Sequence, residues 1–341
     1  MSDPKNHHYV PETYIENFCG EDGTLWLYDK WKGRSFPSRP KKVLKEHFYY
    51  AQPNQDRKTW NYGLENFFSE KIEKDWPFTV RLIQDGPKTL RSLRNLYMFL
   101  YAMRVRVPNC RKAVEYALQQ QVQVVSGMIK DKEYLEGERE VIALINKTLN
   151  SNFQSMEELY DAGIINITID PHRSLLAMAD IAKGFALVVS AIQFHFIKNC
   201  TPVDFNCSDN PVVYFPHEQQ PNACEPFQFL PMRPFEFIFP ITKRYCLYHN
   251  SQYPIRAQQI AVTETNDSNL VGRINKFIGA FADRFLVSSK ELNASELPAK
   301  NLCPRLTVHK YPEERGTFLN FQYEMGEPLQ LPKWKNKFEP A

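Results

Sequence analysis

The chain has 341 residues, of which 43% are hydrophobic and 13% aromatic, enough for a sizeable core and too many for a generally disordered protein. Its 42 basic and 39 acidic residues leave a net charge of only +3, which does not by itself indicate nucleic-acid binding, although a local basic face stays compatible with it. The first residues are polar and no stretch approaches the roughly 18 uncharged apolar residues of a membrane span, so we expect neither a signal peptide nor membrane contact.

The cysteines favour a reduced, cytoplasmic protein. There are seven of them, an odd number, and no two form a Cys-x-x-Cys pair, which argues against a disulfide framework. A structural zinc site normally has closer ligand pairs, but a site assembled from His195, Cys200, Cys207 and His217 is an alternative to ordinary buried cysteines.

The first part of the chain, residues 7–60, is predicted to be a β-rich module. It contains a short helix at 13–18, a turn at 20–23, and an aromatic strand at 25–28 that a second turn joins to another strand.

The middle part, residues 62–200, is predicted to be mainly helical, because apolar residues recur there at helical spacing. Pro108 is expected to end or kink the second helix, residues 131–172 are polar and expected to be peripheral, and the last helix is expected to be buried in the core. The predicted helices span 64–72, 90–105, 113–129 and 175–197.

Residues 201–290 are predicted to return to strands with one helix at 263–282, and residues 291–341 form a C-terminal extension that loops over the surface. The chain is therefore predicted to be α+β, with a β-rich N-terminal module, a central helical core and a C-terminal sheet.

Several separated motifs occur in an order that resembles a bacterial and phage family catalogued as domain of unknown function 4238. The resemblance covers roughly residues 7 to 290 and implies no settled activity. Because its motifs are spread over all three parts of the chain, it implies that residues 7–290 form a single integrated domain whose two β parts pair. Val107 and Cys207 stand where the family usually has threonine, which weakens any role for a hydroxyl there. The motifs are His7-His8-Tyr9-Val10-Pro11, Leu64-Glu65 through Ile72-Glu73, Arg106-Val107-Pro108 with Arg111, Ser208-Asp209-Asn210-Pro211, Phe239-Pro240-Ile241-Thr242, and Asn275 before Ala282-Asp283-Arg284-Phe285.

The adjacent His7 and His8 are the first candidate site residues. In a strand they would face opposite sides, so at most one would point into a site, whereas in a turn both could converge. That one would be a general base or a metal ligand; the alternative is that both hydrogen-bond to the backbone and hold the N-terminal segment in place. The motif is also similar to the catalytic strand of His-Asn-His nucleases, with His47 as a candidate partner.

Asp209 and Asn210 are candidate ligands or orienting groups for a divalent metal, because Mg²⁺ and Mn²⁺ prefer hard oxygen ligands. The alternative is an ordinary turn in which Asp209 caps backbone amides.

Arg104, Arg106 and Arg111 lie at the end of an apolar helix and need partners if they are buried. They either bind phosphate or carboxylate of a substrate, or form internal salt bridges to Glu65, Glu73 or Asp209. Asn275, from the resembled motifs, is a further candidate substrate-binding residue.

A basic stretch, Arg39, Lys41, Lys42 and Lys45, lies near several aromatic residues. Such a combination can follow a nucleic-acid backbone and stack on bases, or it can be a solvated loop. The aromatic residues are Trp31, Phe36, Phe48 and Tyr49.

The leading hypothesis is a metal-assisted phosphodiester hydrolase, a nuclease with a defence or toxin role. His7 or His8 would be the general base or a ligand, Asp209 would hold Mg²⁺ or Mn²⁺ with Asn210 orienting it, and Arg106 would stabilise phosphate charge. No phosphate-binding loop is present, so no nucleotide cofactor is expected. The alternatives are a non-catalytic module that binds a protein or a nucleic acid, and an enzyme acting on a small anionic ligand.

Overall fold

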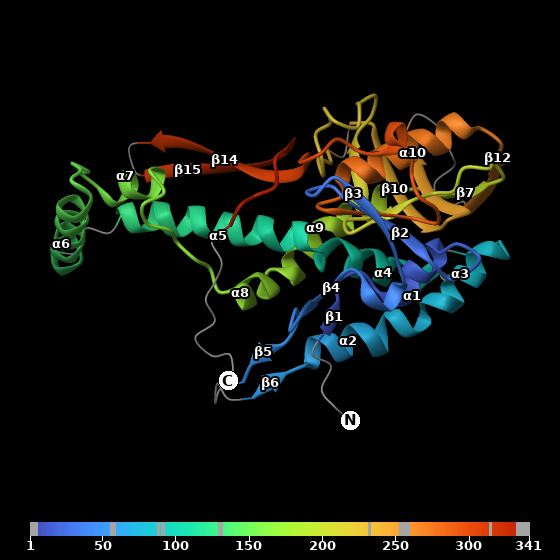
Figure 1. The fold of residues 1–341 in the computed structure, drawn as a ribbon, viewed down its shortest axis with the longest axis horizontal. Helices are drawn as coiled ribbons and strands as arrows, with labels where there is room; N and C mark the ends of the chain where they lie inside the picture. Colours follow the sequence, from blue (N-terminus) through green and yellow to red (C-terminus); the bar gives the residue numbers. More distant parts are fainter. Residues whose placement is uncertain are drawn as a thin grey trace.

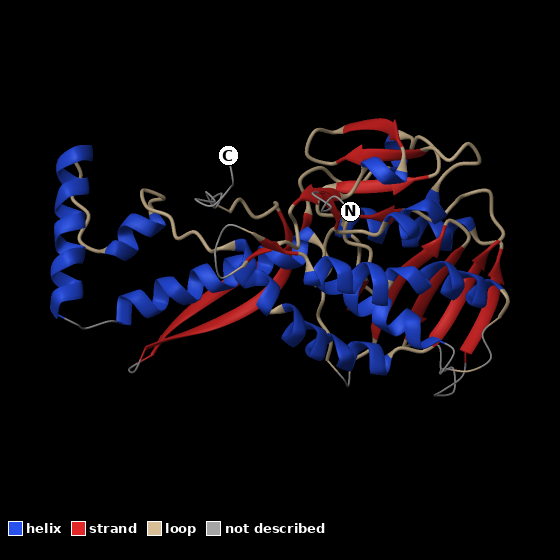
Figure 2. Cartoon of the chain, turned by 90° about the horizontal axis from the view of Figure 1, so that it is seen from below, coloured by secondary structure: helices blue, strands red, loops and turns tan. Residues whose placement is uncertain are grey.

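The computed structural model describes residues 6–54, 59–86, 89, 93–128, 132–230, 233–251, 260–313 and 316–331. The molecule is elongated (Figure 1), with a broad body at one end and an arm at the other. The arm consists of α5 (Pro108–Met128), α6 (Lys132–Leu149), α7 (Met156–Asp161) and the hairpin of β14 (Cys303–Glu313) and β15 (Gly316–Gly326). Seen from below in Figure 2, α6 stands at the far end of the arm, crosswise to α5.

The body is built around a five-stranded sheet with the order β12-β7-β11-β10-β9. All eight residues of β10 are buried, as expected for a strand covered on both faces. Its strands are β7 (Phe194–Asn199), β9 (Val213–Pro216), β10 (Phe235–Thr242), β11 (Tyr245–Asn250) and β12 (Ile260–Thr265).

Two helices cover opposite faces of this sheet. Phe185 of α9 (Met178–Ala191) stacks on Phe237 of β10 with ring centroids 6.3 Å apart. Phe277 of α10 (Ser268–Phe281) stacks on Phe215 of β9 at 4.0 Å. Phe215 lies opposite Glu236, the neighbour of Phe237, and successive strand residues point to opposite faces.

A four-stranded sheet, with the order β3-β2-β13-β8, combines strands of the N-terminal β part with strands of the C-terminal β part. In β13, Leu286 lies opposite Tyr28 of β2 on one side and Ser208 of β8 on the other. The predicted pairing of the N-terminal and C-terminal β parts is therefore confirmed, as is the α+β class. The strands are β2 (Leu25–Asp29), β3 (Arg34–Ser38), β8 (Cys207–Ser208) and β13 (Phe285–Ser288).

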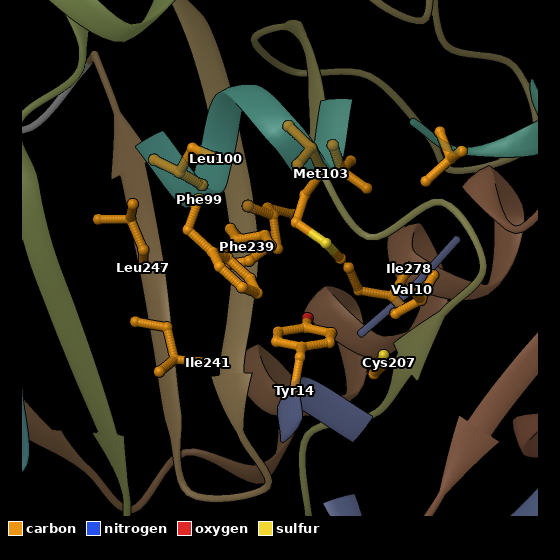
Figure 3. Packing of buried hydrophobic residues seen from close by; sticks show 14 of the residues in the cluster. Val10, Tyr14, Phe99, Leu100, Met103, Cys207, Phe239, Ile241, Leu247 and Ile278 are labelled. Atoms are coloured by element: carbon orange, nitrogen blue, oxygen red, sulfur yellow. The ribbon is translucent and has the colours of Figure 1, made fainter. Parts of the chain in front are cut away.

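The opening motif runs into the centre of the core (Figure 3), where α1 (Glu12–Ile15) points Tyr14 at the large sheet. The Tyr14 hydroxyl donates to the Pro240 carbonyl at 2.7 Å, and its ring stacks on Phe239 at 5.5 Å. Behind it, Trp76 and Phe99 stack at 3.8 Å. Burying each such ring stabilises the fold by about 1.5–3 kcal/mol, so the segment after the two histidines is part of the core.

The remaining elements surround this core. The helices are α2 (Gly63–Lys71), α3 (Trp76–Gln84), α4 (Arg94–Val105) and α8 (Pro171–Leu176), with short 3₁₀ turns at Glu16–Phe18, Pro40–Lys42, Glu73–Asp75 and Ala294–Glu296; the short strands are β1 (Asn6–His8), β4 (Lys45–His47), β5 (Gln52–Pro53) and β6 (Trp60–Asn61).

Two helix predictions need correction. The single buried helix predicted over 175–197 is wrong, because α9 ends at Ala191 and the chain continues as strand β7 from Phe194. The helix before Pro108 ends at Val105, as expected, but Pro108 also begins α5, five residues before the predicted start at 113. Proline suits a first helical position, where its missing N–H has no partner to lose. Residues 90 and 129, at predicted helix ends, lie outside the described residues.

The prediction that the C-terminal extension loops over the surface is also wrong for most of its described length. β14 and β15 pair along their whole length, from Cys303 opposite Gly326 to Glu313 opposite Gly316. This hairpin runs beside α5 and gives the arm its second layer (Figure 1).

Candidate functional site

His7 and His8 are successive residues of strand β1, so their side chains point to opposite sides of it. Of the two alternatives, strand and turn, the structure contains the strand. His7 is fully buried, and its Nδ1 accepts a hydrogen bond from the Tyr50 backbone N–H at 2.9 Å. Its ring stacks on Tyr50 with a centroid separation of 5.9 Å. His7 therefore holds the segment after β4 against β1.

His8 is the half-buried member of the pair. Its Nε2 lies 3.8 Å from a Glu12 carboxylate oxygen. Burial, followed by the positive charges of Lys45 and Arg106, lowers the pKa of His8 to about 4. The imidazole is therefore neutral at neutral pH and a weaker base than an ordinary histidine.

Arg106 has internal partners for every nitrogen of its guanidinium, and its side chain is only 1% exposed. Nε donates to the Tyr50 hydroxyl at 2.8 Å, one terminal nitrogen donates to Glu73 at 2.6 Å, and the other donates to the His8 carbonyl. Of the two alternatives for this arginine, the structure contains the internal salt bridge to Glu73. Burial raises the pKa of nearby Glu65 to about 7.

Arg104 and Arg111 are also enclosed. The guanidinium of Arg104 lies 3.9 Å from the Phe227 ring centroid. The guanidinium of Arg111 lies 4.3 Å from the Tyr49 ring centroid, and it donates to the Tyr49 carbonyl at 2.7 Å and to Ser174 at 3.2 Å. Arg111 thus has internal acceptors. Arg104 is enclosed by aromatic rings, and its Nε and one terminal nitrogen are buried without a hydrogen-bond partner among the described residues.

Asp209 binds the turn that follows α10. One carboxylate oxygen accepts from the Asp283 N–H, and the other accepts from the N–H groups of Arg284 and Phe285, each at 2.8 Å. Burial and the Asp283 carboxylate raise the pKa of Asp209 to about 7, and the backbone donors and Lys30 act in the opposite direction. The motif predicted to hold a metal is therefore joined to the Asp283-Arg284 motif.

The two candidate asparagines make similar internal contacts. Asn210 donates to the Phe281 carbonyl at the end of α10 at 2.8 Å. Asn275, on α10, accepts from the Asn206 N–H and donates to the Asp204 carbonyl, both at 2.8 Å. Both side chains fasten α10 to the segment around β8.

A polar cluster beside Asp209 includes residues that sequence reasoning missed. Lys30 is fully buried and donates to carbonyls that include those of Ala282 at 2.7 Å and Leu302 at 2.6 Å. Burial lowers its pKa to about 8. Lys30 precedes the basic stretch in the sequence, and nothing in the sequence pattern distinguishes this buried lysine from an exposed one.

Two ion pairs lie next to Trp31 in the same cluster. Lys112 contacts Asp283 at 2.6 Å and Arg284 contacts Asp29 at 2.7 Å, and both cations lie within 5 Å of the Trp31 ring centroid, at 4.8 and 4.9 Å. Trp31 itself is 41% exposed.

The described residues contain no group of three or more histidine, cysteine, aspartate or glutamate side chains placed to hold a metal ion. Of the proposed zinc ligands, His195 lies 2.8 Å from the Thr263 hydroxyl, whereas Cys207 is buried in β8 and Cys200 is exposed. His47 is exposed at the end of β4, with its ring on Phe48 at 4.3 Å.

Comparison with known proteins places the chain in one family. The model of the family described as "Protein of unknown function (DUF4238)" matches residues 6–291, so the chain belongs to this family. No curated protein and no solved structure matches it. Within the described part of the chain, no helix is both long and apolar enough to span a membrane.

Proposed function

We propose that this chain is a nucleic-acid-binding protein that contacts the phosphate backbone through a basic strip. The basic strip consists of Lys32, Arg34, Arg39, Lys41, Lys42 and Lys45.

The observation that carries the proposal is that these cations are left available to solvent. Residues 30–45 contain seven lysines and arginines and no acidic residue. Five of the six strip residues are exposed and Lys45 is half-buried. Among the described residues, none of the six has a salt-bridge partner, in contrast to Lys112 and Arg284 close by. Unpaired cations on one segment attract a polyanion and release its counterions on binding.

Aromatic side chains accompany the strip. Trp31 is 41% exposed, and Phe36 is half-buried on β3, the edge strand of the four-stranded sheet, with the Arg34 guanidinium 5.9 Å from its ring centroid. Tyr49 is buried and Phe48 stacks on Trp60 at 5.0 Å. Of the four predicted aromatics, Trp31 and Phe36 keep some exposed surface, and Lys112 and Arg284 already contact the Trp31 ring, which leaves only part of it for a base.

Binding rather than hydrolysis is proposed because three of the predicted site residues already hold other parts of the structure together. Arg106, Asp209 and Asn210 each bind groups that hold the core together. Metal-assisted hydrolysis remains a prediction from the sequence.

The proposal is tested with labelled single-stranded RNA, single-stranded DNA and duplex DNA at several salt concentrations. We expect the logarithm of affinity to fall with the logarithm of salt concentration by about 0.7–0.9 for each phosphate contacted. The triple variant Arg39→Glu, Lys41→Glu, Lys42→Glu should bind at least about tenfold more weakly. The matched control reverses Arg139, Lys147 and Lys183, which are exposed elsewhere. Equal weakening in both triples, or no binding by the wild type, would overturn the proposal.

The same samples test hydrolysis when Mg²⁺, Mn²⁺ or a chelator is added. Metal-dependent cleavage that His8→Ala abolishes without unfolding the protein would support the hydrolase and place His8 in its site. Binding without cleavage would leave the non-catalytic module.

A further inference from the structure

A pocket of about 270 Å³ opens on the half of the five-stranded sheet that ends in edge strand β12. It has no lining residue in common with the basic strip or with the predicted catalytic groups. The residues used below are Gln193, His195, Ile197, Tyr248, Thr263 and Leu270.

The strand register explains why these side chains share one face. Ile197 of β7 lies opposite Cys246 of β11 and Thr263 of β12. Because side chains alternate along a strand, His195 and Tyr248, two residues along from Ile197 and Cys246, lie on the same face. Leu270 of α10 borders the pocket from the helix layer.

Next to α10, the polar wall of the pocket is held by hydrogen bonds to the carboxylate of Glu236. Glu236 is fully buried and accepts two hydrogen bonds from Arg273, at 2.6 and 2.7 Å, and one from the Tyr248 hydroxyl at 2.8 Å. His217 Nδ1 lies 3.3 Å from the same carboxylate. The carboxylate charge is thereby balanced by Arg273, and the Tyr248 ring is held in one orientation.

Apart from Glu264, the other polar groups in the pocket are neutral. His195 Nε2 lies 2.8 Å from the Thr263 hydroxyl, and His249 Nδ1 accepts from the Gln193 N–H at 3.2 Å. Burial lowers the pKa of both histidines, that of His249 to about 4. The one charged residue among the lining residues is Glu264, which pairs with Lys198 at 2.8 Å.

We infer that this pocket binds an uncharged, planar molecule with hydrogen-bonding edges, of the nucleobase or nucleoside class. Ile197 and Leu270 offer apolar contact to ring faces, while the Thr263 hydroxyl and the second ring nitrogen of His195 can hydrogen-bond to ring edges. Ligand pockets usually measure about 300–1,000 Å³, so this small one suits a single base or nucleoside and not a dinucleotide. No lysine or arginine lines it, so a phosphate group gains no contact there.

The test is a titration of the full chain with adenosine, guanosine, cytidine and uridine, and with the matching nucleoside monophosphates, followed by thermal unfolding and calorimetry. At least one nucleoside should raise Tm in a dose-dependent, saturable way, because it binds the folded state alone. High salt is used, and the triple variant of the basic strip should respond as the wild type does, which separates this inference from the proposed nucleic-acid binding.

Two variants assign the binding to the pocket. Thr263→Val removes an exposed hydroxyl and should weaken binding by up to about tenfold. Leu270→Trp fills the pocket and should abolish binding. Thr148→Val and Leu144→Trp, on exposed positions of α6, make the same changes elsewhere and should have no effect.

Three results would overturn the inference: no response to any nucleoside, binding that both pocket variants leave unchanged, or a monophosphate that binds more tightly than its nucleoside. The last would mean that a cation reaches the ligand and that the pocket does not select uncharged molecules.

Discussion

Helices α10 and α6 have similar apolar periodicity and opposite surroundings. In α10, seven of 14 residues are buried between the two sheets. In α6, none of the residues 135–149 is buried, and Val141, Leu144 and Leu149 are 42%, 65% and 51% exposed. An isolated helix of this length is marginal in water, and most helices depend on packing of their apolar face. Periodicity therefore indicates that a helix has an apolar face, while the tertiary fold decides whether other elements cover that face.

The sharpest contrast is expected between two phenylalanines. Phe99 is 1% exposed in the body and Phe318 is 57% exposed on the arm hairpin. Phe99→Ala should lower the free energy of unfolding by about 3–5 kcal/mol, since it leaves a cavity beside Trp76. Phe318→Ala should change it by no more than about 0.5 kcal/mol. Chemical denaturation measures both, and similar losses would mean that the arm is packed as firmly as the body.

Two arginines extend the contrast to charged residues. Arg106→Met removes the partner of Glu73 and should cost about 3 kcal/mol, because a partly buried carboxylate is left without its cation. Arg139→Met on α6 should be nearly neutral, since Arg139 is exposed. A neutral Arg106→Met in the same denaturation experiment would show that the buried arginine is not structural and would return it to the list of candidate catalytic groups.

A smaller effect should appear in acid. The folded pKa of His8 lies near 4, below its ordinary value of 6.5, so protonation favours the unfolded chain. The contribution of neutral His8 to the free energy of unfolding is complete above pH 6.5. It is lost as pH falls towards 4, by at most about 1.4 kcal/mol per pH unit. Glu65, with its raised pKa, acts oppositely as pH rises from 4.5 to 7. The useful quantity is therefore the difference in unfolding free energy between wild type and His8→Gln, and a difference that does not vary with pH would contradict the prediction.

The smallest effect concerns α6 itself. Leu144→Ser exchanges an exposed apolar side chain for a polar one and should alter stability by less than about 0.5 kcal/mol. Leu100→Ser in α4, where the leucine is fully buried, is the matched substitution and should lower Tm substantially. A marked loss with Leu144→Ser would reveal that a partner or a second copy covers α6 in solution.

The fold class was predictable from periodicity and composition, and the pairing of the two β parts was inferred from the spread of the family-like motifs over the chain. The boundary near residue 192 was not, because the apolar run that includes Phe194, Phe196 and Ile197 suits a buried strand as well as the end of a buried helix. The arm hairpin was missed for another reason: the prolines and lysines of the tail indicated loops, while the ladder from Cys303 to Gly326 depends on pairing between strands.

The candidate site was predicted in part. Strand alternation correctly placed His7 and His8 on opposite sides of β1, and the internal salt bridge offered as one alternative for Arg106 is present. The sequence could not show that Asp209 accepts three backbone N–H groups 74 to 76 positions away. It also gave no sign of the pocket beside β12, because that pocket is assembled from β7, β11, β12 and α10 by sheet register.

The rate at which Lys30 is acylated measures how often the contacts at the base of the arm open. Its ammonium group contacts the last turn of α10 and the carbonyl of Leu302, one residue before β14 begins. An amine-acylating reagent can reach this nitrogen only after those carbonyls separate, whereas exposed lysines such as Lys183 react at once. The rate at which Lys30 is acylated, read by mass spectrometry, therefore reports how often the hairpin detaches from the body.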